Sequence, residues 1–141
     1  NHLLPFEFKQ FKIAHDKCAM KVGVDGVLIG SWAKHDKPKY ILDIGTGSGL
    51  IALMMQQRYP ESKIIGIEPN INSYHQALDN FKNTNFKHQP TAYQNTLSNF
   101  HPIKKRVDVL VLFNQVVRAS VMQQERGFWR RWRYARCGTL C

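Results

Sequence analysis

Ile41-Leu42-Asp43-Ile44-Gly45-Thr46-Gly47-Ser48-Gly49 is the stretch of sequence that decides the fold. The segment 39–44 is short and rich in β-branched side chains, which is typical of a buried parallel strand. Three glycines at alternate positions follow directly and allow a sharp turn, in which the backbone approaches a ligand closely because glycine carries no Cβ. The helix that we expect next would present its free N–H groups to that ligand.

Strands and helices alternate around this turn. Strands are predicted at residues 39–44, at 63–68 and from Arg106 or Val107 to Phe113, with one further short strand within residues 86–100. Helices are predicted from Asp25 to Lys34 with the apolar stripe Val27, Leu28, Ile29 and Trp32, from a Ser48 cap to Tyr59-Pro60, and from Asn70 or Asn72 through Phe81. This order predicts an α/β fold of the doubly wound, Rossmann-like type, a parallel sheet with helices on both faces that binds ligands at the carboxyl ends of its strands.

The glycine spacing distinguishes two classes of nucleoside cofactor. A dinucleotide-binding turn has the pattern G-x-G-x-x-G, which requires glycine at position 50, where this chain has Leu50. The spacing G-x-G-x-G instead resembles S-adenosylmethionine-dependent methyltransferases, and this resemblance implies cofactor contacts from Gly45, Gly47 and Gly49. In that pattern Asp43 lies near the methionine end of the cofactor. The alternative for Asp43 is a polar residue that caps the turn.

Glu68 ends the second predicted strand, 25 residues after Asp43. A carboxylate at this place can accept hydrogen bonds from both ribose hydroxyls of a bound nucleoside. A nicotinamide-dependent enzyme would place an acidic residue there as well, so Glu68 indicates a nucleoside without choosing between the two cofactors. The alternative is an exposed charge at the end of a strand.

Two N-terminal runs are not explained by the building of a sheet. They read FEFKQFKI at residues 6–13 and HDKCAMKVGVDGVL at residues 15–28. Together with LDIGTGSGL at residues 42–50, they closely resemble the bacterial tRNA1(Val) adenine N6-methyltransferases. The resemblance is strong over residues 6–83 and weak from there to about residue 111. The resemblance implies a small enzyme domain that uses S-adenosylmethionine as its cofactor and tRNA as its partner, and that methylates N6 of an adenine beside the anticodon.

The same resemblance extends the predicted cofactor site to the N-terminal side. In that family the segment equivalent to residues 20–30 packs over the cofactor cleft, which makes Lys21 and Asp25 candidate cofactor-binding residues. One departure is Val24, because the family usually has Thr at this position.

The residues that such an enzyme needs for catalysis are missing. Related enzymes hold the adenine amine with Asn-Pro-Pro-Tyr directly after the fourth strand of the sheet. This chain has Leu112-Phe113-Asn114-Gln115-Val116-Val117, in which the asparagine comes one position late and Pro-Pro-Tyr is absent. The catalytic residues therefore stay unassigned, with Asn114 as a weak candidate, and we expect a chain that binds cofactor but does not methylate adenine.

The composition changes near residue 106. Up to Lys105 the basic residues are twelve Lys and one Arg, whereas from Arg106 onward they are seven Arg and no Lys. This change indicates a truncation or a changed reading frame after about residue 111, or else a real basic helix. We expect a single methyltransferase domain whose sheet is incomplete on its C-terminal side, with a cap segment (1–38), a cofactor-binding core (39–113) and an atypical basic tail (114–141).

The net charge of +10 favours polyanionic partners such as RNA. The apolar run from Val107 to Phe113 is far shorter than the roughly 20 residues of a membrane span, and the three cysteines match no zinc spacing. We expect a cytoplasmic monomer that binds neither a membrane nor a metal. Two other functions stay open: a non-catalytic RNA-binding module that uses residues 118–136, and a methyltransferase that acts on a protein or a small molecule.

Aromatic and basic residues alternate near the N-terminus, at Phe6, Phe8 and Phe11 with Lys9 and Lys12. Such a mixture is suited to stacking on bases and pairing with phosphates in single-stranded RNA. Packing of the three rings into the core is the favoured prediction, since alternate residues of a strand share one face.

Overall fold

A parallel sheet of four strands forms the centre of the computed structural model, which describes residues 4–19, 21–96, 99 and 109–112. The strands are β3 (Tyr40–Ile44), β4 (Lys63–Ile67), β5 (Thr91–Tyr93) and β6 (Val109–Leu112), in the spatial order β5-β4-β3-β6. Asp43 on β3 lies opposite Gly66 on β4 and Val111 on β6. From β3 the chain adds β4 and β5 on one side and then β6 on the other side. The order of strands therefore reverses between β3 and β6, which is where a doubly wound fold binds its ligands. The predicted α/β, Rossmann-like fold is confirmed.

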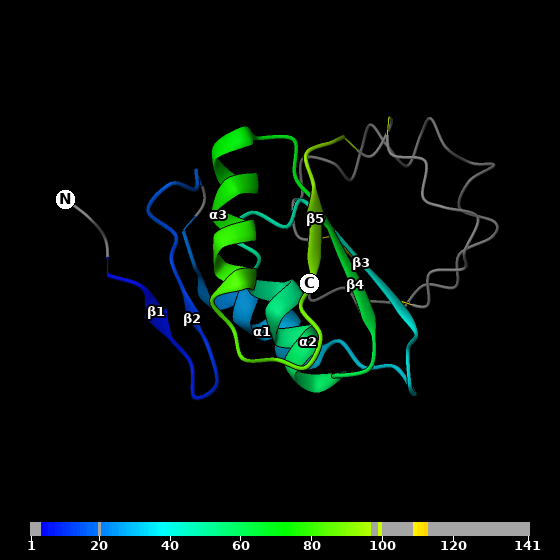
Figure 1. The fold of residues 1–141 in the computed structure, drawn as a ribbon. Coiled ribbons are helices and arrows are strands. Elements are labelled where there is room, and N and C mark those ends of the chain that lie inside the picture. The colour runs from blue at the N-terminus through cyan, green and yellow to red at the C-terminus, as the bar shows by residue number, and fades with distance from the viewer. Residues whose placement is uncertain (1–3, 20, 97–98, 100–108, 113–141) are drawn as a thin grey trace, which may run out of the picture.

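Three helices cover one face of this sheet, as Figure 1 shows. They are α1 (Val24–Trp32), α2 (Leu50–Arg58) and α3 (Ile71–Lys82). An antiparallel hairpin of β1 (Phe6–Glu7) and β2 (Lys12–Ile13) lies beside α3 on the side away from the sheet (Figure 1). Helices on the opposite face stay a prediction, because every helix in the described part of the chain lies on this one.

The core fills the space between the sheet and the helices. Its largest fully buried apolar side chains are those of Ile13, Ile41, Leu53, Met55, Ile64 and Phe81. They come from β2, β3, α2, β4 and α3, so that the N-terminal hairpin shares one core with the sheet. The interior of the described fold is therefore continuous from the hairpin to β4.

Helix α1 differs from the prediction in its start and in its buried face. It begins at Val24 after a Gly23 cap and ends at Trp32, so Asp25 lies in its first turn instead of capping it. Leu28 and Trp32 are exposed, whereas Gly26 and Gly30 are buried. The reason is a close approach of two helices, because a Cβ on Gly30 would lie 2.5 Å from the sulfur of Met54 on α2.

The other predicted elements are close to the observed ones. Helix α2 is capped by Gly49 in a left-handed conformation and not by the side chain of Ser48. Asn70 caps α3 as predicted, since its Oδ1 accepts the Ser73 N–H at 3.0 Å. The short strand expected within residues 86–100 is β5.

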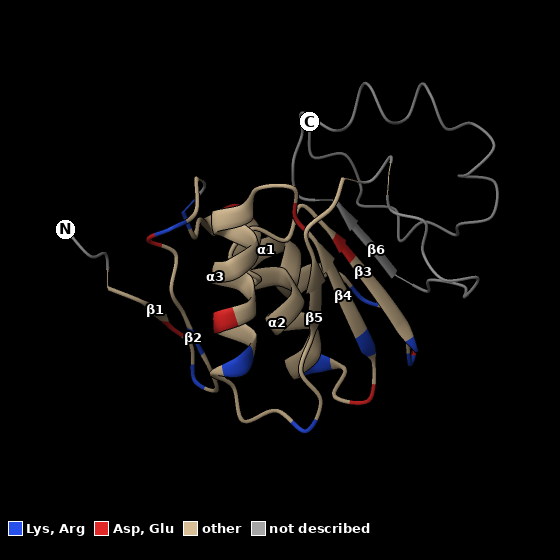
Figure 2. Ribbon diagram, turned by 45° about the horizontal axis from the view of Figure 1, so that its top comes forward, with Lys and Arg blue, Asp and Glu red and all other residues tan. Residues whose placement is uncertain are grey.

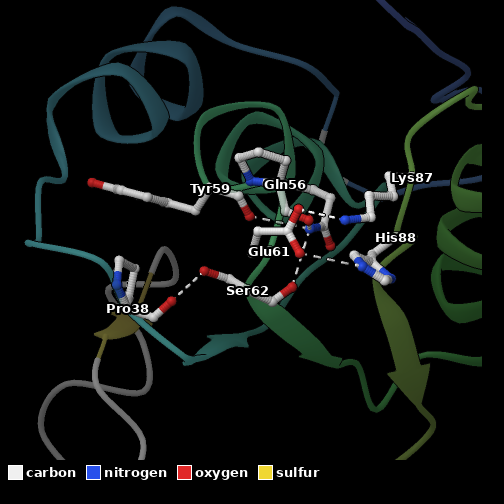
Figure 3. Close-up of polar contacts among 8 residues, drawn as sticks. Pro38, Gln56, Tyr59, Glu61, Ser62, Lys87 and His88 are labelled. Atoms are coloured by element: carbon white, nitrogen blue, oxygen red, sulfur yellow. Dashed lines mark hydrogen bonds and ion pairs between the residues drawn. The ribbon is translucent and has the colours of Figure 1, made fainter.

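A polar cluster closes the end of the sheet opposite the glycine turn (Figure 3). The buried amide of Gln56 donates to the carbonyls of Tyr59, Pro60 and Ser62, which shapes the connection from α2 to β4. The Ser62 hydroxyl donates to the carbonyl of Pro38 just before β3. Glu61 pairs with Lys87 at 2.7 Å, but both side chains are exposed, so this ion pair adds little stability. These contacts serve the fold and lie far from the turn.

Candidate cofactor site

The loop between β3 and α2 has the backbone conformation that only glycine adopts readily. Gly45, Gly47 and Gly49 have φ angles of +72°, +56° and +86°. The N–H groups of Gly45 and Thr46 both donate to the carbonyl of Ile67, at 2.8 and 3.0 Å, which ties the loop to the end of β4. The sharp turn is thereby held at the carboxyl ends of two neighbouring strands.

The glycines of this loop have different surroundings. A Cβ added to Gly47 would meet no atom within 4 Å, so the backbone there borders open space. A Cβ added to Gly49 would lie 2.4 Å from the ring of Phe81 on α3. Gly49 is therefore needed for packing, whereas Gly47 leaves room for a ligand to approach the chain.

Glu68 connects the glycine loop to the start of α3. Its Oε2 accepts the N–H of Gly47 and its Oε1 accepts the N–H of Asn70, each at 2.9 Å. The residue is only 8% exposed, so the alternative of an exposed charge at the end of a strand is wrong. Each carboxylate oxygen has two acceptor positions, which leaves one per oxygen for a ligand hydroxyl.

Asp43 is buried under the same loop, with 1% exposure. Its Oδ2 accepts the hydroxyl of Thr46 at 2.7 Å, while its Oδ1 has no hydrogen-bond partner among the described residues. Burial raises the pKa of Asp43 to about 6; the Thr46 hydroxyl and the backbone N–H of Ala52 lower it, and the charge of Glu68 raises it. Two buried carboxyl groups in one site create a negative potential that suits a cationic ligand.

The two oxygens of Asp43 bear on both interpretations of that residue. The bond from Oδ2 to Thr46 supports the capping alternative, because it stabilises the turn itself. The Oδ1 has no partner among the described residues, but it is buried, so it does not by itself support a ligand contact. A cofactor contact from Asp43 stays a prediction.

Lys21 organises the loop before it. Its ammonium group donates to the carbonyls of His15, Asp16 and Cys18 at 2.9, 3.0 and 2.9 Å, which uses all three of its hydrogens. Asp25 is exposed on the first turn of α1. The structure brings Asp43, the three glycines and Glu68 together, while cofactor contacts from Lys21 and Asp25 remain predictions.

Two buried amides that the sequence analysis missed hold the N-terminal segment against α3, and one of them also reaches the glycine loop. Gln76 accepts the N–H of Lys17 at 3.1 Å, and Asn80 binds both Ala14 and Ser48. Both side chains are 3% exposed. The only sequence signal is their spacing of four residues on α3, which places two amides on one helix face.

The N-terminal hairpin buries its aromatic rings to different degrees. Phe11 lies in the core, and Phe8 stacks on it with ring centres 4.6 Å apart, as the prediction of core packing requires. Phe6 is 46% exposed, so the prediction is wrong for this ring. The hairpin and α3 enclose a groove of about 500 Å³ whose walls include Phe8, Lys9 and Lys12.

The remaining predictions fall partly beyond the described chain. Asn114, the composition change and the basic tail lie outside the described residues. Within the residues that the structure describes, no group of His, Cys, Asp and Glu side chains is arranged to hold a metal ion. In the same part of the chain no helix is long and apolar enough to cross a membrane.

A family model described as a methyltransferase domain matches residues 41–136. Curated relatives named tRNA1(Val) (adenine(37)-N6)-methyltransferase include one from Pseudoalteromonas translucida, which is 55% identical over 75 residues, or 53% of this chain and 32% of the relative. Another, from Salmonella typhi, is 39% identical over 127 residues, which cover 86% of this chain and 52% of the relative. The chain thus spans about half or less of the length of these relatives.

Solved structures share the fold at low sequence identity. TYW2 from Pyrococcus horikoshii, solved in complex with MeSAdo, matches with a TM-score of 0.60 and 16% identity over 77% of this chain and 41% of that one. A second protein from the same organism matches with a TM-score of 0.61 and 18% identity over 77% and 42% of the two chains. At this identity the likeness concerns the arrangement of the sheet and its helices.

Proposed function

Because this chain belongs to the family of methyltransferase domains, we propose that it binds S-adenosylmethionine over the glycine loop, at the carboxyl ends of β3 and β4. The observation that carries the proposal is the joining of the loop to Glu68 through the Gly47 N–H, with open space above Gly47. In this arrangement the carboxylate of Glu68 would accept hydrogen bonds from the ribose hydroxyls. Asp43, buried under the loop, would lie near the methionine end and contribute its negative charge there.

The charge of the site fits this cofactor better than a dinucleotide. S-adenosylmethionine carries a sulfonium and an ammonium cation, which the carboxyl groups of Asp43 and Glu68 attract. Glu68 is compatible with either cofactor, but the pyrophosphate of a dinucleotide would face the buried carboxyl group of Asp43. When bound, the cofactor supplies the sulfonium methyl group that an adenine amine takes, while the residues of this site hold and orient it.

Calorimetric titration with S-adenosylmethionine, S-adenosylhomocysteine and NAD tests the cofactor. We expect the first two to bind more tightly than NAD, and Glu68→Gln to weaken their binding by about tenfold or more, because the amide loses one acceptor. Glu61→Gln is the matched control, since Glu61 is an exposed carboxylate at the opposite end of the sheet. Binding of NAD alone would overturn the assignment.

For the protein as a whole we propose a cytoplasmic enzyme that methylates N6 of an adenine in tRNA. The names and identities of the curated relatives support this substrate. The exchange of Asn-Pro-Pro-Tyr for Phe113-Asn114-Gln115-Val116 removes the groups that hold the amine in such enzymes, so we expect no methyl transfer by this chain. Transfer of labelled methyl groups to unmodified tRNA above a control without enzyme would contradict this expectation.

RNA binding without catalysis is the second candidate function. The observation that favours it is the gathering of Arg130, Arg131, Arg133 and Arg136 with two tryptophans near the end of the chain. Replacing these four arginines by Gln would weaken tRNA binding and reduce its dependence on salt if this segment binds RNA. An unchanged affinity and salt dependence would exclude the segment as an RNA contact.

A further inference from the structure

The side chain of Asn80 on α3 links two segments that are distant in the sequence. Its Nδ2 donates to the carbonyl of Ala14 at 2.8 Å and to the carbonyl of Ser48 at 2.7 Å, and its Oδ1 accepts the N–H of Ala14 at 2.9 Å. The residue is 3% exposed, so these bonds are shielded from water. Every hydrogen of the amide is thereby used on a backbone carbonyl.

One of these partners belongs to the glycine loop itself. Ser48 lies between Gly47, which borders open space, and Gly49, which packs against Phe81. Two positive-φ glycines flank Ser48, so the local backbone has little intrinsic preference for one conformation. A fixed partner for the Ser48 carbonyl therefore restricts the backbone conformation of the loop between its two flexible glycines.

The other partner belongs to the N-terminal segment. Ala14 follows β2, and the two bonds that it exchanges with Asn80 resemble the pairing of adjacent strands. Three residues later, the N–H of Lys17 donates to Gln76, one helical turn before Asn80. Both amides thus hold residues 14–17 against α3, but only Asn80 also holds the glycine loop.

We propose that Asn80 is a positioning residue for the cofactor site, which keeps the glycine loop in its binding conformation by joining it to the docked N-terminal segment. This inference rests on the proposed binding of S-adenosylmethionine. Asn80 acts through the loop and touches no reacting atom. Its amide is required because both carbonyls, of Ala14 and of Ser48, need a donor.

Exchange of the amide for a carboxylate separates this role from simple packing. Asn80→Asp keeps the shape of the side chain and the acceptor for the Ala14 N–H, but it turns oxygen lone pairs toward the carbonyls of Ala14 and Ser48. Gln76→Glu is the matched control, because Gln76 is equally buried, lies on the same helix and needs only its acceptor for Lys17. The same chemical change is therefore made twice, once with and once without loss of the bond to the glycine loop.

Two measurements test the proposal on the full chain. Amide hydrogen exchange of the peptide spanning residues 45–53 reports on the loop, and calorimetric titration with S-adenosylhomocysteine reports on the site. We expect Asn80→Asp to speed the exchange of this peptide by about tenfold or more and to weaken binding by at least about tenfold, with both properties of Gln76→Glu near those of the unmodified protein.

The outcomes keep the two proposals apart. If the unmodified protein fails to bind S-adenosylhomocysteine, the proposed function is wrong, while loop exchange still decides the role of Asn80. If Asn80→Asp leaves either the exchange or the affinity unchanged, or if Gln76→Glu has the same effects, the positioning role is overturned. Should Asn80→Asp fail to fold by circular dichroism, Asn80→Ala replaces it in the same comparison with Gln76→Ala, because this pair adds no repulsion between oxygens.

Discussion

At the scale of single residues, the site depends on the carboxyl groups of Glu68 and Asp43, which differ in their hydrogen bonds. Glu68 joins the glycine loop to α3 through two backbone N–H groups, and each of its oxygens retains an acceptor position. Asp43 is buried more deeply, and one of its oxygens lacks a partner within the described structure. An unpaired buried acceptor weakens the fold by about 1–3 kcal/mol.

The raised pKa of Asp43 predicts a pH dependence of stability. The pKa of Asp43 is about 6 in the folded state, whereas in the unfolded chain it has its ordinary value of 3.8. The stabilising contribution is therefore fully present below about pH 4 and is lost as the pH rises through about 6, a change of about 3 kcal/mol. Asp43→Asn should remove this component from the free energy of unfolding, measured in urea from about pH 4 to 8.

Glu61→Gln is the control for this measurement. The pKa of Glu61 is lowered, chiefly by its hydrogen bond with Lys87, so its contribution has the opposite sign and grows as the pH rises. A difference between the unmodified protein and Asp43→Asn that stays constant over the whole pH range would contradict the prediction.

Two glycine substitutions distinguish a glycine that leaves space for a ligand from one that is required by packing. Gly47→Ala should cost about 1–2 kcal/mol of stability from its left-handed φ alone and should weaken cofactor binding, because the new methyl group enters open space beside the loop. Gly49→Ala adds a clash with Phe81 and should destabilise the fold by a further 1–3 kcal/mol or so. Urea unfolding and calorimetry check both, and a larger loss of stability in Gly47→Ala than in Gly49→Ala would contradict this account.

At the scale of elements, we expect the hairpin of β1 and β2 to contact RNA if the proposed function holds, because aromatic and basic residues alternate there. The residues that line its groove against α3 include Phe8, Lys9 and Lys12. Lys12 is paired with Glu7 at 2.7 Å, which leaves Lys9 as the better candidate for a phosphate. Figure 2 shows the basic residues of the described chain at the ends of elements and in loops, so the hairpin is one of several places where they occur.

Lys9→Gln should weaken the binding of unmodified tRNA and lower the magnitude of the salt slope by about 0.7, the value for one phosphate contact with a single strand. Lys63→Gln is the control, since Lys63 is an exposed lysine at the start of β4, at the end of the sheet away from the glycine loop. Filter binding over a range of salt concentrations measures both variants. Equal effects of the two substitutions would indicate a general charge effect and exclude a specific contact.

At the scale of the whole molecule, the cofactor site gathers residues from much of the described chain. The glycine loop, the start of α3 and the N-terminal segment are joined by hydrogen bonds of Glu68, Asn80 and Gln76. A ligand that contacts the loop would therefore stabilise the molecule as a unit and not only its own surroundings.

S-adenosylhomocysteine at about 100 times its dissociation constant should raise the free energy of unfolding by about 2.7 kcal/mol. The gain arises because the ligand binds the folded state and has no site on the unfolded chain. Urea unfolding with and without the ligand measures it, with NAD at the same concentration as the control. Equal stabilisation by both compounds would mean that the site does not distinguish them.

Local features of the sequence determined the order of strands and helices, the glycine turn with its positive φ angles and the Asn70 cap of α3. Each of these follows from periodicity or backbone preference within a few residues. Only the tertiary structure decided that Leu28 and Trp32 face outward, that Glu68 is buried on the Gly47 N–H, and that Asn80 reaches both Ala14 and Ser48. These features depend on contacts between segments 21 to 66 residues apart, as in the bonds from Gly47 to Glu68 and from Ala14 to Asn80, and no local pattern encodes which distant surfaces will meet.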